Sequence, residues 1–194
     1  MFSASEADRD INPAGASGLP AESRKYGKIM SKKAKTHKTN AVRIVEANKI
    51  EYEMLTYDAA GGFVDGVTVA KETGIEPERC FKTLVLAGSS KEHFVCVIPV
   101  AEELDLKKAA RHFGEKKIEM IHARDITRVT GYVKGGCSPV GMKKLFRTAI
   151  DRSAEDFEII GVSGCKFGLQ MMLPPESLAE IVGADFADLT AGRG

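Results

Sequence analysis

The chain has 194 residues, 43% of them hydrophobic, which suffices for one domain of ordinary size with a buried core. Its 28 lysines and arginines almost cancel 27 aspartates and glutamates, and the net charge of +1 neither requires nor excludes a polyanionic partner. No apolar run approaches the roughly 20 residues of a membrane span, and the first 30 residues lack the apolar stretch of a signal peptide, so we expect a soluble, cytoplasmic protein without membrane association.

Residues 1–36 are predicted to form a disordered tail that ends in a basic segment. They lack hydrophobic periodicity and are rich in small and polar residues, so they cannot bury enough apolar surface to offset the entropy of ordering. Seven basic residues and no acid lie in 24–38. Because these seven charges exceed the net charge of the whole chain, the remainder is acidic overall. The basic segment is therefore the best candidate for nonspecific attraction to a nucleic acid.

The first half of the predicted domain, which we expect over 37–190, alternates helices with strands. Apolar residues at three-to-four spacing predict a helix over 39–48 with Thr39 as its N-cap, and 50–57 is typical of a strand. After a glycine-bearing loop, a short helix is predicted over 68–73, where Gly74 ends it. Residues 80–87 and 93–100 are apolar and prone to form strands. The polar segment 88–92 between them predicts a hairpin.

The second half continues the same irregular alternation. Residues 106–113 carry the apolar stripe of a helix that Gly114 would end. Further strands are predicted at 118–121, 148–150, 158–162 and 169–173, with helices at 123–130 and after Pro174 or Pro175. This pattern predicts a single domain of the α+β class, in which helices surround one curled, mixed β-sheet.

Lys82 is the first candidate for chemistry, because it is a charged residue in an apolar strand. In a strand its side chain shares a face with Leu84 and Leu86, which would place the lysine in a partly desolvated position or at the rim of a pocket. Desolvation shifts the pKa of a lysine, and such lysines are often functional. The alternative is a lysine at the end of a strand whose side chain reaches water.

The glycine-rich segment 135–141 is the second candidate. Its glycines permit positive φ angles and let backbone N–H groups approach a ligand closely. No Gly-Lys-Ser/Thr follows, so the segment is not a phosphate-binding P-loop. A tight connection needed only for topology remains the alternative. Basic residues bracket the segment and could meet phosphates or form a solvated surface: Lys134, Lys143, Lys144 and Arg147.

The cysteines offer a weaker candidate. Cys80, Cys96, Cys137 and Cys165 form no Cys-x-x-Cys pair, which argues against a zinc ribbon and for reduced thiols. A thiol nucleophile at Cys137 or Cys165 would need an activating partner, and none of the four histidines can be assigned to that role. We expect inert thiols and no metal or other cofactor.

Several motifs together resemble the YbaK/EbsC family, which comprises aminoacyl-tRNA deacylases related to the editing domain of bacterial prolyl-tRNA synthetases. The resemblance covers about residues 37–190. In chain order the motifs are Phe81-Lys82-Thr83-Leu84, Pro99 with Leu104-Asp105-Leu106-Lys107-Lys108, Thr130-Gly131-Tyr132, Gly135-Gly136-Cys137-Ser138-Pro139-Val140-Gly141, and Val162-Ser163-Gly164 with Gly168-Leu169.

The resemblance implies both a fold and a function. The fold would be a partly barrel-like mixed sheet surrounded by helices. The activity would be trans-editing, in which the 3′-aminoacyl ester of a misacylated tRNA is hydrolysed, with Cys-tRNA(Pro) as the first choice of substrate and Ala-tRNA(Pro) as the second. Prolyl-tRNA synthetase would be a potential partner. The sequence leaves the oligomeric state open, and a non-catalytic module that binds aminoacyl-tRNA or a synthetase is the alternative from another class.

The resemblance also assigns roles to residues. The family's essential lysine falls on Lys82, its pocket tyrosine on Tyr57 and its pocket glycine on Gly135. The same motifs suggest substrate-binding roles for a further set: Thr83, Gly136, Ser138, Ser163 and Gln170. One departure concerns Gln170, because well-studied members have an aspartate there. A glutamine can hydrogen-bond an amine but cannot pair with its charge.

Overall fold

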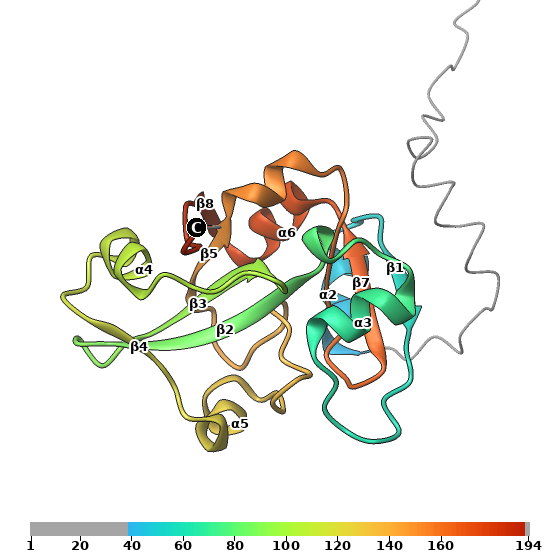
Figure 1. The fold of residues 1–194 in the computed structure, drawn as a ribbon, viewed down its shortest axis with the longest axis horizontal. Helices are drawn as coiled ribbons and strands as arrows, with labels where there is room; N and C mark the ends of the chain where they lie inside the picture. The colour runs from blue at the N-terminus through green and yellow to red at the C-terminus, as the bar shows by residue number, and fades with distance from the viewer. Residues whose placement is uncertain (1–38, 193–194) are drawn as a thin grey trace, which may run out of the picture. The chain divides into compact units, whose positions relative to one another are not determined.

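The structure of the protein is a computed structural model, and it describes residues 39–192. The predicted tail over 1–36 therefore lies outside the described residues. Figure 1 shows the elements in chain order. The helices are α2 (Asn40–Ala47), α3 (Gly66–Thr73), α4 (Leu106–Phe113), α5 (Ile126–Thr130) and α6 (Pro175–Val182), with 3₁₀ turns at Pro77–Arg79, Ala123–Asp125 and Arg152–Asp156. The strands are β1 (Glu53–Thr56), β2 (Phe81–Gly88), β3 (His93–Pro99), β4 (Ile118–Met120), β5 (Arg147–Asp151), β6 (Ile160–Ser163), β7 (Leu169–Leu173) and β8 (Ala184–Ala187).

The strands form two sheets. A five-stranded sheet has the order β4-β2-β3-β5-β8, antiparallel on the β2 side and parallel from β3 to β8, and an antiparallel three-stranded sheet has the order β1-β7-β6. One isolated parallel bridge, between Cys80 and Gly161, links them. The predicted α+β class is confirmed. The strands are nevertheless divided where one curled sheet was expected, and neither sheet closes into a barrel.

The two ends of β2 have neighbours in different sheets. The last residues of β2, Leu86–Gly88, pair with β4, whereas Cys80, just before β2, bridges to β6. In an antiparallel pair, every second residue hydrogen-bonds to the partner strand. The Cys80 carbonyl accepts the Val100 N–H at 2.8 Å, so the even-numbered residues of β2 bond to β3. The backbone N–H and C=O of Thr83 therefore point to the opposite side, into the space between β4 and β6. That gap beside β2 is where the cavity described below lies.

Strand β3 fixes the position of β2 because it is buried on both faces. Val95 and Val97 belong to one hydrophobic cluster with residues of α2, β7 and α6, and Phe94, Cys96 and Ile98 belong to a second cluster with residues of α4. This alternation places a core on each side of the strand. The hairpin partner β2 is thus held rigidly against a fully packed strand.

Element boundaries agree with the sequence predictions to within a few residues in most places. The helix at 106–113 and the strand at 169–173 are confirmed without change, whereas the strand predicted over 50–57 shortens to β1 and the helix predicted over 123–130 divides into a 3₁₀ turn and α5. Strand β8 was not predicted.

Within residues 39–192, no helix has the length and apolar content needed to cross a membrane.

Cys96 gives the fold a testable pH dependence. Burial, reinforced by the charge of Asp151, raises the pKa of its thiol from 9.0 to about 12. The unfolded chain releases this proton near pH 9 while the folded chain keeps it, so the free energy of unfolding must fall as the pH rises above about 9. Between pH 9 and 11 we expect the wild-type protein to lose about 1 kcal/mol per pH unit more than Cys96→Ala. Urea unfolding at several pH values would measure how the free energy of unfolding of each protein changes with pH. Equal changes in the two proteins would contradict the raised thiol pKa of Cys96.

Candidate active site

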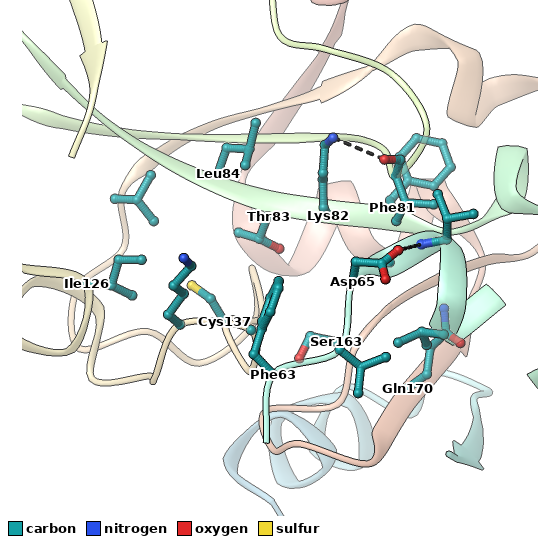
Figure 2. Close-up of a pocket in the computed structure, with 18 of the residues that line it drawn as sticks. Phe63, Asp65, Phe81, Lys82, Thr83, Leu84, Ile126, Cys137, Ser163 and Gln170 are labelled. Atoms are coloured by element: carbon teal, nitrogen blue, oxygen red, sulfur yellow. Dashed lines mark hydrogen bonds between the residues drawn. The ribbon is translucent and has the colours of Figure 1, made fainter. Parts of the chain in front are cut away.

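A cavity of about 410 Å³ lies in the gap beside β2. Its volume is within the range of small-molecule sites, roughly 300 to 1,000 Å³. Figure 2 shows that its walls come from β2, the segment before α3, the turn after β4, the glycine-rich loop, and strands β6 and β7. Six of the eight residues predicted for the site line it: Tyr57, Lys82, Thr83, Gly135, Ser163 and Gln170.

Lys82 is half-buried in the cavity wall and is held by the backbone. Its Nζ donates a hydrogen bond to the Val100 carbonyl at 3.1 Å (Figure 2). Burial lowers the pKa of the ammonium, and the charges of Glu103 and Glu102 act in the opposite direction. An ammonium has three donors. With one donor fixed on Val100, the others can serve a ligand in the cavity.

Two hydroxyl groups in the cavity wall are buried without a hydrogen-bond partner. They are Thr83 Oγ1 on β2 and Ser163 Oγ at the end of β6, and among the described residues these two side-chain atoms alone have that property. A buried hydroxyl without a partner costs free energy, so native proteins usually satisfy such groups. Because their residues line the cavity, a polar ligand there is a candidate partner for both groups.

A side chain at Gly135 would collide with its neighbours. Its φ is +85°, and a Cβ built there would lie 2.5 Å from Phe63 Cδ2 and 2.8 Å from Phe167 Cε1. The two rings therefore pack directly over the backbone of the loop. The Phe63 ring is 58% exposed and lies 5.4 Å from Lys134 Nζ, a cation–π arrangement. Gly135 thus allows an aromatic group to form the rim of the cavity.

Gly136 and Ser138 are not brought to the cavity, although both were predicted to bind substrate. Ser138 is fully buried, and its Oγ accepts the Val140 N–H at 3.3 Å within the loop itself. A Cβ on Gly136 would meet Val133 Cγ2 at 3.3 Å. In this structure both residues shape the loop, and the loop presents Gly135.

Tyr57 and Gln170 line the cavity from the same end of the β1–β7 pairing, where Thr56 lies opposite Leu169 and Leu55 opposite Gln170. Tyr57 is half-buried, and burial raises the pKa of its phenol. The Gln170 side chain is buried, and its amide is engaged at both ends: Nε2 donates to Cys80 Sγ at 3.3 Å, and Oε1 accepts from Thr73 Oγ1 at 3.2 Å. The amide therefore belongs to an internal network that closes this end of the cavity.

The thiols do not form a nucleophilic site. Cys137 lines the cavity, but burial raises the pKa of its thiol to about 12, so the thiol stays protonated at neutral pH. Cys165 lies outside the cavity wall, and its Sγ donates to Tyr132 Oη at 3.3 Å. None of the three histidines in the described part of the chain lines the cavity. Across residues 39–192, no three His, Cys, Asp or Glu side chains are grouped so that they could hold a metal ion.

Sequence reasoning missed two groups of cavity residues. One comprises Phe63 and Asp65 in the segment before α3, and the other comprises Met120, Ile121 and Ile126 around the turn after β4. A signal existed for Phe63, because an isolated aromatic residue in a glycine-rich polar loop rarely serves the core. Asp65 carried only the signal of an N-cap, and the apolar residues resembled core positions.

Comparison with known proteins places the chain among tRNA-editing proteins. A family model described as the aminoacyl-tRNA editing domain matches residues 65–181. A protein of Enterococcus faecalis, named as a proposed Cys-tRNA(Pro)/Cys-tRNA(Cys) deacylase, EbsC, is 43% identical over 161 residues. That match covers 83% of this chain and 98% of the relative.

Solved structures share the fold. The crystal structure of a proposed trans-editing enzyme for prolyl-tRNA synthetase has a TM-score of 0.68 at 22% identity, over 79% of this chain and 96% of that one. The crystal structure of a hypothetical protein has a TM-score of 0.71 at 20% identity, over 78% and 99% of the two chains. At such identities the likeness supports the architecture alone, and it agrees with the α+β fold described above.

Proposed function

We propose, from the premise that this chain belongs to the aminoacyl-tRNA editing domain family, that it removes the amino acid from misacylated tRNA in trans. Cys-tRNA(Pro) is the substrate we assign to it. The observation that carries this choice is the 43% identity over nearly the whole length of the Enterococcus faecalis relative, whose name includes that substrate. The cavity beside β2 is the site at which we expect the 3′-aminoacyl ester to bind.

The groups in the cavity suit the hydrolysis of an ester that is already activated. Such a reaction needs the ester held in place and donors directed at the oxygen that gains charge, each worth about 3 kcal/mol. Lys82 offers ammonium donors, and the backbone N–H of Thr83 points into the same gap. No protein nucleophile is required, because water can attack the carbonyl carbon while the tRNA 3′-oxygen leaves with a proton.

A cysteinyl ester also carries its own nucleophile. Its thiol can attack the carbonyl carbon, forming a C–S bond as the C–O bond to the tRNA breaks, and the thiol proton is transferred to the leaving oxygen. In either route the proposed role of Lys82, Thr83 and Ser163 is to position the ester and stabilise the oxyanion. Tyr57 and Gln170 would limit the space for the amino-acid side chain, as size selection in editing requires.

The proposed partners follow from the substrate. Aminoacyl-tRNA would present its acceptor end to the cavity, in the cytoplasm where translation occurs. The basic segment 24–38 would add nonspecific attraction to the phosphates, because the rest of the chain is acidic overall. Prolyl-tRNA synthetase would supply tRNA selectivity in addition to the two lysines, Lys82 and Lys134, that line the cavity among the described residues.

A deacylation panel tests the proposed function. Purified protein would be incubated at stated salt with Cys-tRNA(Pro), Ala-tRNA(Pro), Cys-tRNA(Cys) and Pro-tRNA(Pro), and the remaining ester measured over time. We expect Cys-tRNA(Pro) to be cleaved and Pro-tRNA(Pro) to persist. Preferential loss of Ala-tRNA(Pro) would reassign the substrate. Binding of tRNA without loss of any ester would replace the enzyme by a binding module.

The structure also predicts that the thiols of this protein are dispensable for turnover. The double variant Cys137→Ser, Cys165→Ser should keep kcat/KM within about threefold of the wild type, because the Cys137 thiol is protonated and Cys165 lies outside the cavity wall. The measurement is deacylation of Cys-tRNA(Pro), with thermal melting to check the fold. Loss of activity from a folded double variant would support a thiol hydrolase instead.

A further inference from the structure

We propose that the carboxylate of Asp65 binds the α-ammonium group of the aminoacyl substrate, an inference that rests on the proposed deacylase function. Every aminoacyl ester carries an α-amino group, and such groups are protonated below about pH 8. A cavity that takes this cation partly out of water must supply an anion or several acceptors, because an unpaired charge out of water is costly, and the exposed carboxylate of Asp65 lies at its wall.

Among the described residues that line the cavity, Asp65 alone carries a negative charge. The other charged groups of the wall are the cations Lys82 and Lys134. Without Asp65, the described residues of the wall would present only cations to an ammonium group. Gln170 cannot replace it, since its side chain is neutral and its amide already bonds to Thr73 and Cys80.

Hydrogen bonds hold the Asp65 carboxylate in place and leave it able to accept one more. As the N-cap of α3, its Oδ1 accepts the N–H groups of Val67 and Thr68, both at 3.1 Å, and its Oδ2 accepts the Thr68 hydroxyl at 2.7 Å. A carboxylate has about four acceptor positions, so one on Oδ2 remains for a ligand. These bonds, chiefly that from Thr68, also lower the pKa of Asp65, which keeps the group ionised at neutral pH.

A close contact places Asp65 and Lys82 on the same cavity. Gly66 follows Asp65, and a Cβ at Gly66 would overlap the side chain of Val100. The carbonyl of Val100 is the group that binds Lys82 Nζ. The absence of a side chain at Gly66 therefore lets the start of α3 approach the residue that holds the lysine. Figure 2 shows Asp65 and Lys82 in one close-up, with a bond from each side chain to its backbone partner. Asp65 would then bind the α-ammonium group while Lys82 donates a hydrogen bond to the ester.

The test compares two stable analogues of the substrate's 3′ end, at about pH 6.5 so that the amine is charged. One is 3′-cysteinylamino-3′-deoxyadenosine, and the other is its 3-mercaptopropionyl counterpart, which lacks only the α-amine. Calorimetry would measure the Kd of each for the wild type and for Asp65→Asn. Asparagine also caps helices, so the substitution removes the charge while α3 keeps its cap. We expect the wild type to prefer the cysteinyl analogue by about 10-fold or more, and Asp65→Asn to lose that preference.

A matched variant separates charge from capping. Asp105 caps α4 in the same manner, accepting the N–H groups of Lys107 and Lys108 at 2.8 and 3.1 Å, and it does not line the cavity. Asp105→Asn should keep the wild-type preference. The proposal is overturned if Asp65→Asn also keeps it, if Asp65→Asn weakens both analogues equally, or if the wild type binds neither. A wild type that shows the preference yet cleaves no ester would overturn the proposed function and leave the role of Asp65 standing.

Discussion

Replacing Lys82 with alanine should lower kcat/KM for Cys-tRNA(Pro) by about 100- to 1,000-fold, the usual cost of removing a donor to a developing oxyanion. The ammonium is half-buried, is fixed on the Val100 carbonyl, and belongs to the same cavity wall as two hydroxyls that lack partners. Its removal leaves Lys134 as the one cation among the described residues that line the cavity. The measurement is single-turnover deacylation, with circular dichroism and thermal melting to confirm that the fold is kept.

Lys117→Ala is the matched control for Lys82→Ala. Lys117 lies just before β4 of the same sheet, is exposed, and forms an ion pair with Glu119 at 2.6 Å. Exposed pairs contribute about 0 to 1 kcal/mol, so this variant should keep both stability and activity. A Lys82→Ala protein that remains folded and fully active would remove the lysine from the proposed chemistry. Loss of activity in both variants would point instead to a general effect of positive charge on tRNA binding.

The placement of Lys82 could be predicted because it depends on local pattern. Alternation along β2 and β3, and the polar segment between them, are sufficient to define a hairpin with a charged residue on its partly buried edge. The family motifs then suggested a role for the lysine, which stays a prediction. The same pattern could not show that the start of β2 is linked to the second sheet, because the Cys80–Gly161 bridge joins residues far apart in the chain.

Strand β8 shows why some elements escape sequence prediction. Its residues, Ala184–Ala187, are short, mixed in polarity and only partly buried, and they follow the glycine that ends α6. The strand exists because it extends a parallel ladder from β5, with Ile150 opposite Phe186. Pairing of this kind depends on tertiary contacts rather than on intrinsic propensity.

The candidate site shows the same limit. Gly136 and Ser138 share a motif with Gly135, yet the turn of the loop directs only Gly135 and Cys137 to the cavity. Asp65 is far from every predicted site residue in the sequence except Tyr57, and its capping role is apparent before its place in the cavity wall. Motif membership therefore predicts the neighbourhood of a site better than it predicts which side chains face a ligand.

Replacing Gly135 with alanine should lower deacylase activity by about 10- to 100-fold, and the free energy of unfolding should fall by about 1 to 2 kcal/mol. Part of the stability loss comes from φ, since +85° is strained for any residue with a Cβ. The larger effect on activity is steric. The new methyl group would collide with Phe63 Cδ2 and Phe167 Cε1, and the more exposed Phe63 would have to move. Movement of that ring reshapes the rim through which the substrate's 3′ end must enter.

Gly114→Ala separates these two effects. Gly114 ends α4 with a φ of +73°, and a Cβ there would have no atom within 4 Å. This variant should therefore lose a comparable amount of stability, about 1 kcal/mol, and keep its activity, because no ring is displaced and the cavity wall is untouched. Equal losses of activity in the two variants would mean that strain alone disables the protein. A selective loss in Gly135→Ala, with urea unfolding showing similar destabilisation of both, would show that the close packing of Phe63 and Phe167 on the loop is what the reaction requires.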